Sequence, residues 1–168
     1  MLQKEELLTQ YPQGLVADLM LKKQLKLATA ESCTGGMIAA ICTDLSGSSA
    51  WFERGFVTYS NEAKTDMLGV EAALIASDGA VSQAVARAMA AGAITHSLAQ
   101  ISVAVTGIAG PTGGSDAKPV GTVWFAWATP LGVTSEVQHF TGDRAAVRQA
   151  TARHAFQQLV LLLQALPA

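Results

Sequence analysis

The stretch "ATAESCTGGMIAA", residues 28–40, sets a serine and a cysteine side by side before two glycines, between an apolar run and an apolar helix. A side chain between a strand's end and a helix's first turn lies beside backbone N–H groups that can hold an oxyanion or a phosphate. Ser32 or Cys33 could therefore be a nucleophile. In the alternative interpretation Ser32 caps the helix and Cys33 is a small buried apolar residue. The N–H groups concerned belong to Thr34, Gly35 and Gly36, and we call residues 31–36 the serine turn.

A serine nucleophile needs a base, and "TYSNEAKTD", residues 58–66, offers one. If Asn61 caps a short helix, Lys64 is its third residue, where the positive end of the helix dipole disfavours an ammonium and lowers the pKa of the lysine. Such a lysine can accept the proton of a serine. Tyr59 could point into the same space. The alternatives are a solvated surface lysine and a rim tyrosine with its hydroxyl in water.

A third candidate is "GIAGPTGGSDAKPVG", residues 107–121, which has five glycines in 15 residues and which we call the glycine loop. Glycines let backbone N–H groups approach an anion closely, so the segment favours a phosphate or nucleotide ligand, with Lys118 as a counter-charge. A plain connection is the alternative, although long irregular segments in compact domains are more often functional. Arg144, in "TGDRAAVR", is either a further anion contact or part of a surface cap. The candidate binding residues of the loop are Thr106, Gly107, Gly110, Gly113 and Gly114.

Histidine and cysteine give weaker signals. The three histidines, His96, His139 and His154, lie outside the glycine-rich and turn segments, so a Ser-His-Asp triad is unsupported. Two cysteines and three scattered histidines form no tight ligand pair, so we expect no metal site and no cofactor. Cys33 and Cys42 are expected to be reduced thiols.

The elements that must position these residues follow from apolar periodicity. It predicts strands at residues 27–30, 51–59, 101–105, 122–129 and 133–140. Helices are expected at residues 15–23, 37–45 and 81–98, around Lys64 and from Asp143 onward, with a turn at residues 4–8. The last two strands are joined by a turn too short for a parallel crossover, so the fold class is a three-layer α/β/α sandwich with a mixed sheet of about five strands. Both glycine-rich segments leave strands at their carboxyl ends and should meet over one crevice.

Bulk composition restricts the partners. A chain of 168 residues, half of them hydrophobic, fits one domain over residues 1–168. With 14% charged residues and a net charge of -2, it does not favour nucleic acid or anionic lipid. The apolar stretches are shorter than the roughly 20 residues that span a bilayer. The first residues do not resemble a signal peptide, so we expect a cytoplasmic protein that does not enter the membrane.

Several motifs together resemble one known family. "TAESCTGG", "GSSAWFERGFVTYSNEAK", "GAVS", "GIAGPTGGSDAKPVGTVWFA" and "GDRAAVR" are similar, in this order, to the CinA C-terminal domain family, whose members include nicotinamide mononucleotide (NMN) amidases. The resemblance covers residues 27–153. It implies an α/β/α fold, a homo-oligomer with a dimer favoured, and hydrolysis of NMN to nicotinate mononucleotide and ammonia in NAD recycling. Because the N-terminal domain of longer CinA proteins does not precede these motifs, the chain resembles the stand-alone form.

Carried over by motif, the resemblance implies that Ser32, Tyr59 and Lys64 form the catalytic group. Ser32 would attack the carboxamide, Lys64 would accept its proton and Tyr59 would relay or orient that proton. The N–H groups of Thr34 and Gly35 would hold the oxyanion, and the glycine loop with Arg144 would take the phosphate.

Two alternatives stay open. A thiol is intrinsically the better nucleophile and a helix N-terminus lowers its pKa, so Cys33 could replace Ser32, although strand alternation should let only one of them face the crevice. The other is a nucleotide-binding regulatory domain without turnover.

Overall fold

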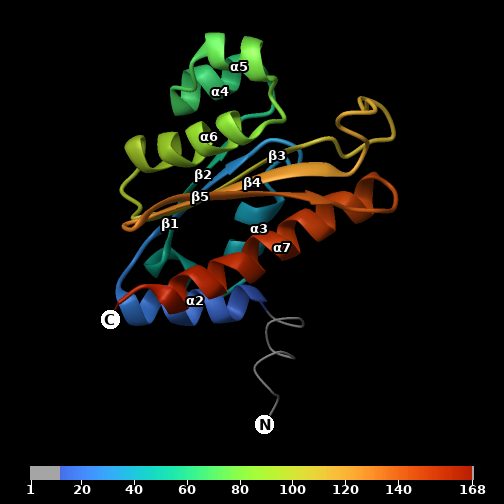
Figure 1. Ribbon diagram of the computed structural model, residues 1–168. Helices are drawn as coiled ribbons and strands as arrows, with labels where there is room; N and C mark the ends of the chain where they lie inside the picture. The colour runs from blue at the N-terminus through green and yellow to red at the C-terminus, as the bar shows by residue number, and fades with distance from the viewer. Residues whose placement is uncertain (1–11, 168) are drawn as a thin grey trace.

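The computed structural model describes residues 12–167 and has a mixed β-sheet with helices on both faces (Figure 1). The helices are α2 (Pro12–Lys23), α3 (Met37–Thr43), α4 (Asn61–Leu68), α5 (Ala72–Asp78), α6 (Gln83–Thr95) and α7 (Arg144–Ala165). The strands are β1 (Leu27–Glu31), β2 (Phe52–Val57), β3 (Ile101–Gly107), β4 (Thr122–Thr129) and β5 (Gly132–His139). The five-stranded sheet has the order β2-β1-β3-β4-β5. Strand β1 is parallel to β2 and β3, whereas β4 is antiparallel to β3 and β5, which confirms the predicted fold class.

The two faces of the sheet differ in side-chain size because neighbouring strand residues point to opposite faces. On the face covered by α2, α3 and α7, strands β3 and β4 present large side chains such as Val105, Phe125 and Trp127. On the face covered by α6, the same strands present Ala104 and Ala126. Each fully buried large apolar side chain stabilises the fold by about 1.5–3 kcal/mol. The large-residue face therefore holds most of the apolar core, and the alanine face lets α6 lie close to the sheet (Figure 1).

Helix caps set several of the element boundaries. The Ser60 side chain accepts a hydrogen bond from the Ala63 N–H at 3.0 Å, so Ser60 is the N-cap of α4. Of the two cap-forming residues before this helix, Ser60 is thus the cap rather than Asn61, and Lys64 is the fourth residue of the helix rather than the third. Helix α6 begins after the Ser82 cap, later than predicted. Helix α5 was not predicted, because only Ile75 in it is buried and the segment has no apolar periodicity. The turn expected at residues 4–8 lies outside the described residues.

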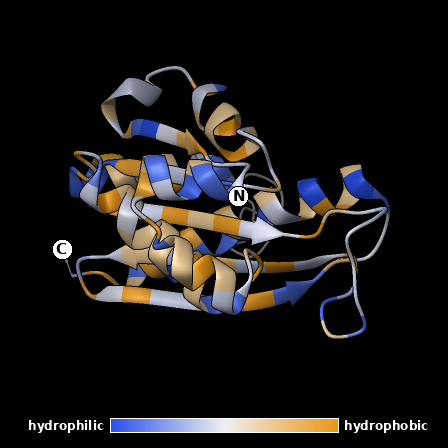
Figure 2. Ribbon diagram, turned by 90° about the horizontal axis from the view of Figure 1, so that it is seen from above, coloured by the Kyte–Doolittle hydropathy of each residue, from blue (hydrophilic) through white to orange (hydrophobic). Residues whose placement is uncertain are grey.

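Polar residues interrupt the apolar ones along the helices (Figure 2). Within residues 12–167, none of the helices combines the length and the apolar character needed to cross a bilayer.

The carboxyl ends of β1, β2 and β3 meet at one edge of the sheet because the three strands are parallel. The serine turn follows β1, the segment leading to α4 follows β2, and the glycine loop follows β3. Beyond that edge the glycine loop, gold in Figure 1, projects away from the sheet. The fold thus brings the three predicted motifs to one place.

Candidate active site

Ser32 and Lys64 are in direct contact. The Nζ atom of Lys64 donates a hydrogen bond to Ser32 Oγ at 3.1 Å. Only 1% of Lys64 and 8% of Ser32 is exposed, although Lys64 is a long charged residue on a short helix. Lys64 is therefore not a solvated surface lysine, and its amine is held against a hydroxyl.

Three backbone carbonyls surround the same amine. Lys64 Nζ lies 3.0 Å from the Thr58 oxygen, 3.2 Å from the Tyr59 oxygen and 3.4 Å from the Ser60 oxygen. Burial lowers the pKa of Lys64 because it removes water from the charged form. The predicted direction of this pKa shift agrees with the structure, and its largest cause is the loss of solvent around the amine. A neutral amine can donate its two protons to carbonyls and direct its lone pair at the Ser32 hydroxyl.

The serine turn is anchored from inside by Glu31, the last residue of β1. Its buried carboxylate accepts hydrogen bonds from the Thr34 hydroxyl at 2.7 Å and from the N–H groups of Gly36 at 3.1 Å, Ile38 at 2.9 Å and Ala39 at 2.8 Å. A carboxylate at a helix N-terminus satisfies donors that have no partner within the helix. Glu31 therefore caps the helix in place of Ser32, to which the alternative interpretation had given that role. The Ser32 hydroxyl is left for Lys64.

Two of the predicted oxyanion donors are occupied in this turn. The Gly35 N–H donates to the Ser32 carbonyl at 3.1 Å, and the Gly36 N–H donates to Glu31. Gly36 has φ +99, and a Cβ atom there would lie 3.3 Å from the Val57 side chain, so this position needs glycine. Among residues 12–167 the Thr34 N–H donates to no acceptor, but Thr34 is fully buried, so its N–H is not open to a ligand.

Arg148 of α7 holds the turn from outside. Its Nε donates to the Cys33 carbonyl at 3.1 Å and its Nη2 to the Thr34 carbonyl at 2.9 Å. Sequence reasoning missed both Glu31 and Arg148. The available signals were an acidic residue at the first position of the serine turn, and a second arginine in "GDRAAVR" four positions after Arg144 and hence on the same helix face.

A cavity of about 240 Å³ opens over the Ser32–Lys64 pair. It confirms that the serine turn and the glycine loop meet over one crevice. Gly113 and Gly114 of the loop are exposed and do not line it. The lining residues are Ser32, Cys33, Tyr59, Asn61, Lys64, Ala80, Val81, Thr106, Gly107, Ala109 and Arg144.

A second cavity of about 470 Å³ shares Ala109 and Arg144 with the first. It lies against the N-terminus of α7, and Arg148 also lines it. The Arg144 side chain stands between the two cavities, where Nη1 donates to the Gly110 carbonyl at 2.8 Å. The two cavities therefore adjoin at Ala109 and Arg144, and we call the second one, which Arg148 also lines, the arginine end of the site.

Tyr59 lies at the mouth of this site, with 63% of the residue exposed. Its hydroxyl accepts a hydrogen bond from Arg144 Nη2 at 3.4 Å, whereas its backbone carbonyl accepts from Lys64. The side chain thus spans from the β2 end to the start of α7 beside the entrance.

Cys33 lines the cavity together with Ser32. Strand alternation predicted that only one of them could face the crevice, but β1 ends at Glu31 and the chain is already turning at these two residues. Burial raises the pKa of the Cys33 thiol to about 12, so it is protonated at neutral pH. Cys33 packs with the apolar core under α7, and both it and Cys42 are buried free thiols.

The histidines lie elsewhere. His154 contacts the Glu136 carboxylate, His139 contacts the Thr122 hydroxyl, and His96 contacts the Gly92 carbonyl near the end of α6. None of the three lines the cavity over Ser32.

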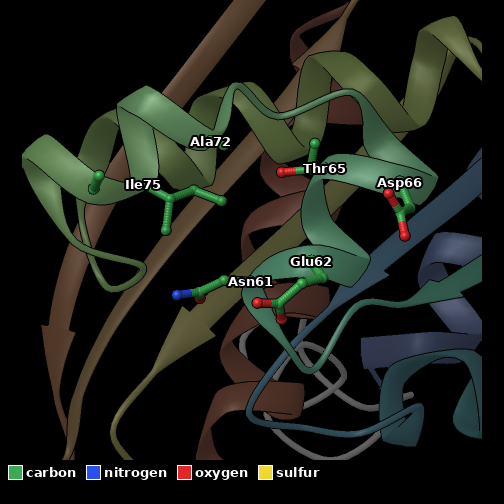
Figure 3. Close-up of a pocket in the computed structure, with 7 residues that line it drawn as sticks. Asn61, Glu62, Thr65, Asp66, Ala72 and Ile75 are labelled. Atoms are coloured by element: carbon green, nitrogen blue, oxygen red, sulfur yellow. The ribbon is translucent and has the colours of Figure 1, made fainter.

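A separate hollow of about 290 Å³ lies between α4 and α5 (Figure 3). In Figure 3, Asn61 and Glu62 lie at the start of α4, and Ile75 of α5 lies beside the same hollow. Its carboxylates, Glu62 and Asp66, disfavour an anion there. Of the two places, the cavity lined by Arg144 and Arg148 is electrostatically the more favourable for an anion.

Comparison with known proteins gives consistent results. Residues 10–163 match the CinA C-terminal domain. Nicotinamide-nucleotide amidohydrolase PncC of Escherichia coli strain K12 is 55% identical over 134 residues, which are 79% of this chain and 81% of that protein. The protein of the same name from Pseudomonas putida is 56% identical over 137 residues, 82% of this chain and 86% of that one. The crystal structure of the competence damage-inducible protein A from Klebsiella pneumoniae matches with a TM-score of 0.91 at 37% identity and covers 95% of this chain and 99% of that one.

Proposed function

The chain belongs to the CinA C-terminal domain family, and from that membership we propose that it hydrolyses the carboxamide of NMN to nicotinate mononucleotide and ammonia, a step of NAD recycling. Relatives that share 55% and 56% of their aligned residues with it are named nicotinamide-nucleotide amidohydrolases. The observation that carries the mechanistic part of the proposal is the 3.1 Å hydrogen bond between Lys64 Nζ and Ser32 Oγ.

In the proposed reaction the neutral Lys64 amine takes the proton of Ser32 as Oγ attacks the carboxamide carbon. Backbone N–H groups of the serine turn would stabilise the resulting oxyanion. The C–N bond then breaks, and Lys64 returns the proton to the departing nitrogen, which leaves as ammonia. Water opens the nicotinoyl ester of Ser32 with Lys64 again as the base, and this step regenerates the free hydroxyl.

The carbonyls around Lys64 suit both protonation states of this cycle. The neutral amine donates two hydrogen bonds and keeps a lone pair for Ser32, while the ammonium donates three. Because the oxygens of Thr58, Tyr59 and Ser60 are already in place, the ammonium is stabilised without water entering the site.

The two adjoining cavities support a mononucleotide substrate. The pyridine ring would lie in the cavity over Ser32, and the phosphate would lie in the adjoining cavity near Arg144 and the first turn of α7. Binding energy from the remote phosphate would then hold the carboxamide against Ser32. The Tyr59 hydroxyl is directed to Arg144 rather than to Lys64, which argues against a proton relay through Tyr59. Tyr59 would instead orient the pyridine ring at the entrance of the cavity.

An ammonia-release assay tests the proposal. Purified protein is given NMN, nicotinamide riboside or nicotinamide, and ammonia is measured with a coupled enzyme. We expect turnover with NMN and a much lower kcat/KM when the phosphate is absent. Saturable NMN binding without ammonia release would instead support the regulatory nucleotide-binding domain.

We also propose that the protein works in the cytoplasm as a homo-oligomer, with a dimer favoured. The two buried free thiols are compatible with a reducing compartment. Sedimentation velocity across a range of protein concentrations tests the dimer, and a monomer at all concentrations would contradict it.

A further inference from the structure

We propose that Gly92 of α6 is a positioning residue for the base of the reaction, because α6 holds α4 at this glycine and thereby holds the Lys64 amine against Ser32. The inference rests on the proposed amidase function. Its basis is one close contact, since a Cβ atom at Gly92 would lie 2.1 Å from the Leu68 carbonyl oxygen and 3.0 Å from the Leu68 Cβ atom. The two helices therefore approach more closely here than a residue with a side chain would allow.

Helix α4 depends on this contact because little else holds it. It has eight residues, of which Lys64 and Leu68 are the buried ones. The Ser60 cap, directly after β2, fixes its first end. Its other end is fixed at α6, where Leu68 belongs to the same apolar cluster as Met89. A helix shorter than about 12 residues is stabilised by such tertiary contacts rather than by its own propensity.

The end of α4 that lies against Gly92 also holds the backbone of Lys64. The N–H of Val70, a buried residue, donates to the Lys64 carbonyl at 3.2 Å. A displacement at Leu68 is therefore passed to Lys64, about one helical turn earlier. Helix α6 lies between α4 and the sheet (Figure 1), so this displacement is directed away from the sheet edge that bears Ser32. The 3.1 Å contact between Lys64 Nζ and Ser32 Oγ would then open.

Helix α6 is the more firmly held of the two helices. The Ser102 hydroxyl of β3 donates to the Ala90 carbonyl at 2.7 Å, two residues before Gly92. A side chain added at Gly92 should therefore displace α4 rather than α6. Non-bonded heavy atoms pack best at about 3.5 Å, so the displacement at Leu68 is about 1 Å, and catalytic groups must be held to within about 0.5 Å. The buried residues of α6 are Val85, Ala86, Met89, Ala90, Gly92 and Ala93.

A purely structural role for Gly92 is the competing interpretation. Both roles predict a lower free energy of unfolding for Gly92→Ala, but only the positioning role changes the kinetic constants of the folded protein. Helix α4 contributes no lining residue to the cavity assigned to the phosphate. The loss should therefore fall on kcat rather than on KM.

The pH profile gives a second readout. Burial lowers the pKa of Lys64, so an amine that is drawn toward water regains a higher pKa. Since the neutral amine is the reactive form, the acidic limb of kcat/KM should shift to higher pH. The other titratable residues that line the cavity are Cys33, Tyr59 and Arg144.

The test compares NMN hydrolysis by Gly92→Ala with that of the wild type and of Gly14→Ala, with rates referred to the folded fraction. Gly14 is the matched control, because it lies in helix α2 and a Cβ atom there would have no atom within 4 Å. A misplacement of about 1 Å costs up to about 10²-fold, so we expect Gly92→Ala to lower kcat by about tenfold, with KM within about threefold and the acidic limb at higher pH. Gly14→Ala should match the wild type.

Crystal structures of the wild type and of Gly92→Ala separate the inference from the function it rests on. A Lys64 Nζ atom moved out of hydrogen-bond distance of Ser32 Oγ supports the inference whatever the activity, and an unmoved amine overturns it. A wild-type protein that releases no ammonia from NMN refutes the proposed function. An active wild type whose Gly92→Ala variant keeps kcat within about twofold, or loses only in KM, overturns the positioning role.

If circular dichroism shows that Gly92→Ala is unfolded, Leu68→Val decides, because it shortens the side chain on the other half of the same contact. A kcat lowered about threefold or more at unchanged KM supports the inference, and a wild-type kcat overturns it.

Discussion

The serine turn and the glycine loop are both rich in glycine and both follow strands at the same edge of the sheet, yet they are held very differently. In the turn, Ser32 and Thr34 are buried, and the backbone is held by Glu31 from inside and Arg148 from outside. In the loop, residues 111–117 are all exposed. Backbone hydrogen bonds of Ile108 with Gly121 and Thr122 close the base of the loop. Its side-chain ties are Arg144 to the Gly110 carbonyl and Lys118 to the Asp78 carbonyl.

This difference indicates a division of labour. Reacting atoms need positions held to within a fraction of an ångström, which packed and hydrogen-bonded segments provide. Segments with few buried contacts open locally at low free-energy cost and can adapt to a ligand. We infer that the turn and Lys64 carry the chemistry, while the loop and Arg144 carry substrate binding. Substitutions at the two places should therefore affect different constants.

The largest effect is expected for the base. Lys64→Met keeps an unbranched side chain but removes proton transfer, so kcat/KM for NMN should fall by about 10²–10⁴-fold. The control is Lys22→Met, at an exposed lysine of α2, which should be neutral. A loss of less than about threefold in Lys64→Met would remove the lysine from the mechanism.

The pH profile follows from the same residue. Burial lowers the pKa of Lys64, and the reactive form is the neutral amine. We therefore expect kcat/KM to increase as the pH rises through this lowered pKa and to be low at pH values below it. The residual activity of Lys64→Met should lack this acidic limb, and a limb that persists unchanged would assign it to another group.

The anchoring of the turn is tested by Glu31→Gln. An amide has one acceptor oxygen in place of two, so at least one donor among the Thr34 hydroxyl and the helix N–H groups is left unpaired in a buried site. The free energy of unfolding should fall by about 1–3 kcal/mol, and kcat by about tenfold. Urea denaturation with Glu62→Gln as the exposed control measures this. Equal stability of the two variants would contradict the anchoring role.

At Arg144, beside the glycine loop, we expect a smaller effect, and on KM rather than on kcat. Arg144→Ala should raise KM for NMN by about tenfold and change kcat by less than about threefold, because it removes a charge-assisted contact to the phosphate. Steady-state kinetics of Arg144→Ala, with Arg153→Ala further along α7 as the control, measures both constants. If Arg144→Ala loses kcat as severely as Lys64→Met, the proposed division between turn and loop is wrong.

The smallest effect is expected at the residue next to the nucleophile. Burial keeps the Cys33 thiol protonated, so Cys33→Ala should retain kcat within about threefold and lose only the packing of one sulfur. Iodoacetamide should react slowly with the folded protein, which mass spectrometry of the labelled cysteine can follow. A Cys33→Ala variant as inactive as Lys64→Met would move the nucleophile to the thiol.

Much of the fold could be predicted, because most strands are short runs rich in apolar residues and the long helices have an apolar period. Strand β4 has the predicted bounds, and the short β4–β5 connection correctly indicated an antiparallel pair. Helix α5 was missed because it buries little surface and has no such period. The cap of α4 was misplaced by one residue because Ser60 and Asn61 are both good N-caps, and the choice depends on the end of β2.

Only those site residues that lie in short local motifs could be predicted from the sequence. Ser32, Tyr59 and Lys64 could be chosen from two short stretches and the family resemblance. The role of Glu31 depends on the side to which a strand residue points, and that of Arg148 on a contact between α7 and a turn 115 residues earlier. The burial that lowers the pKa of Lys64 also comes from tertiary packing, which a helix-dipole argument cannot supply.

Ammonia release from saturating NMN by Ser32→Ala is the most direct test of the Ser32–Lys64 mechanism. Calorimetry should show that the variant still binds NMN, because the arginine end of the site is intact. With the nucleophile removed, kcat should fall by about 10³-fold or more. A Ser32→Ala protein that releases ammonia at close to the wild-type rate would contradict the mechanism.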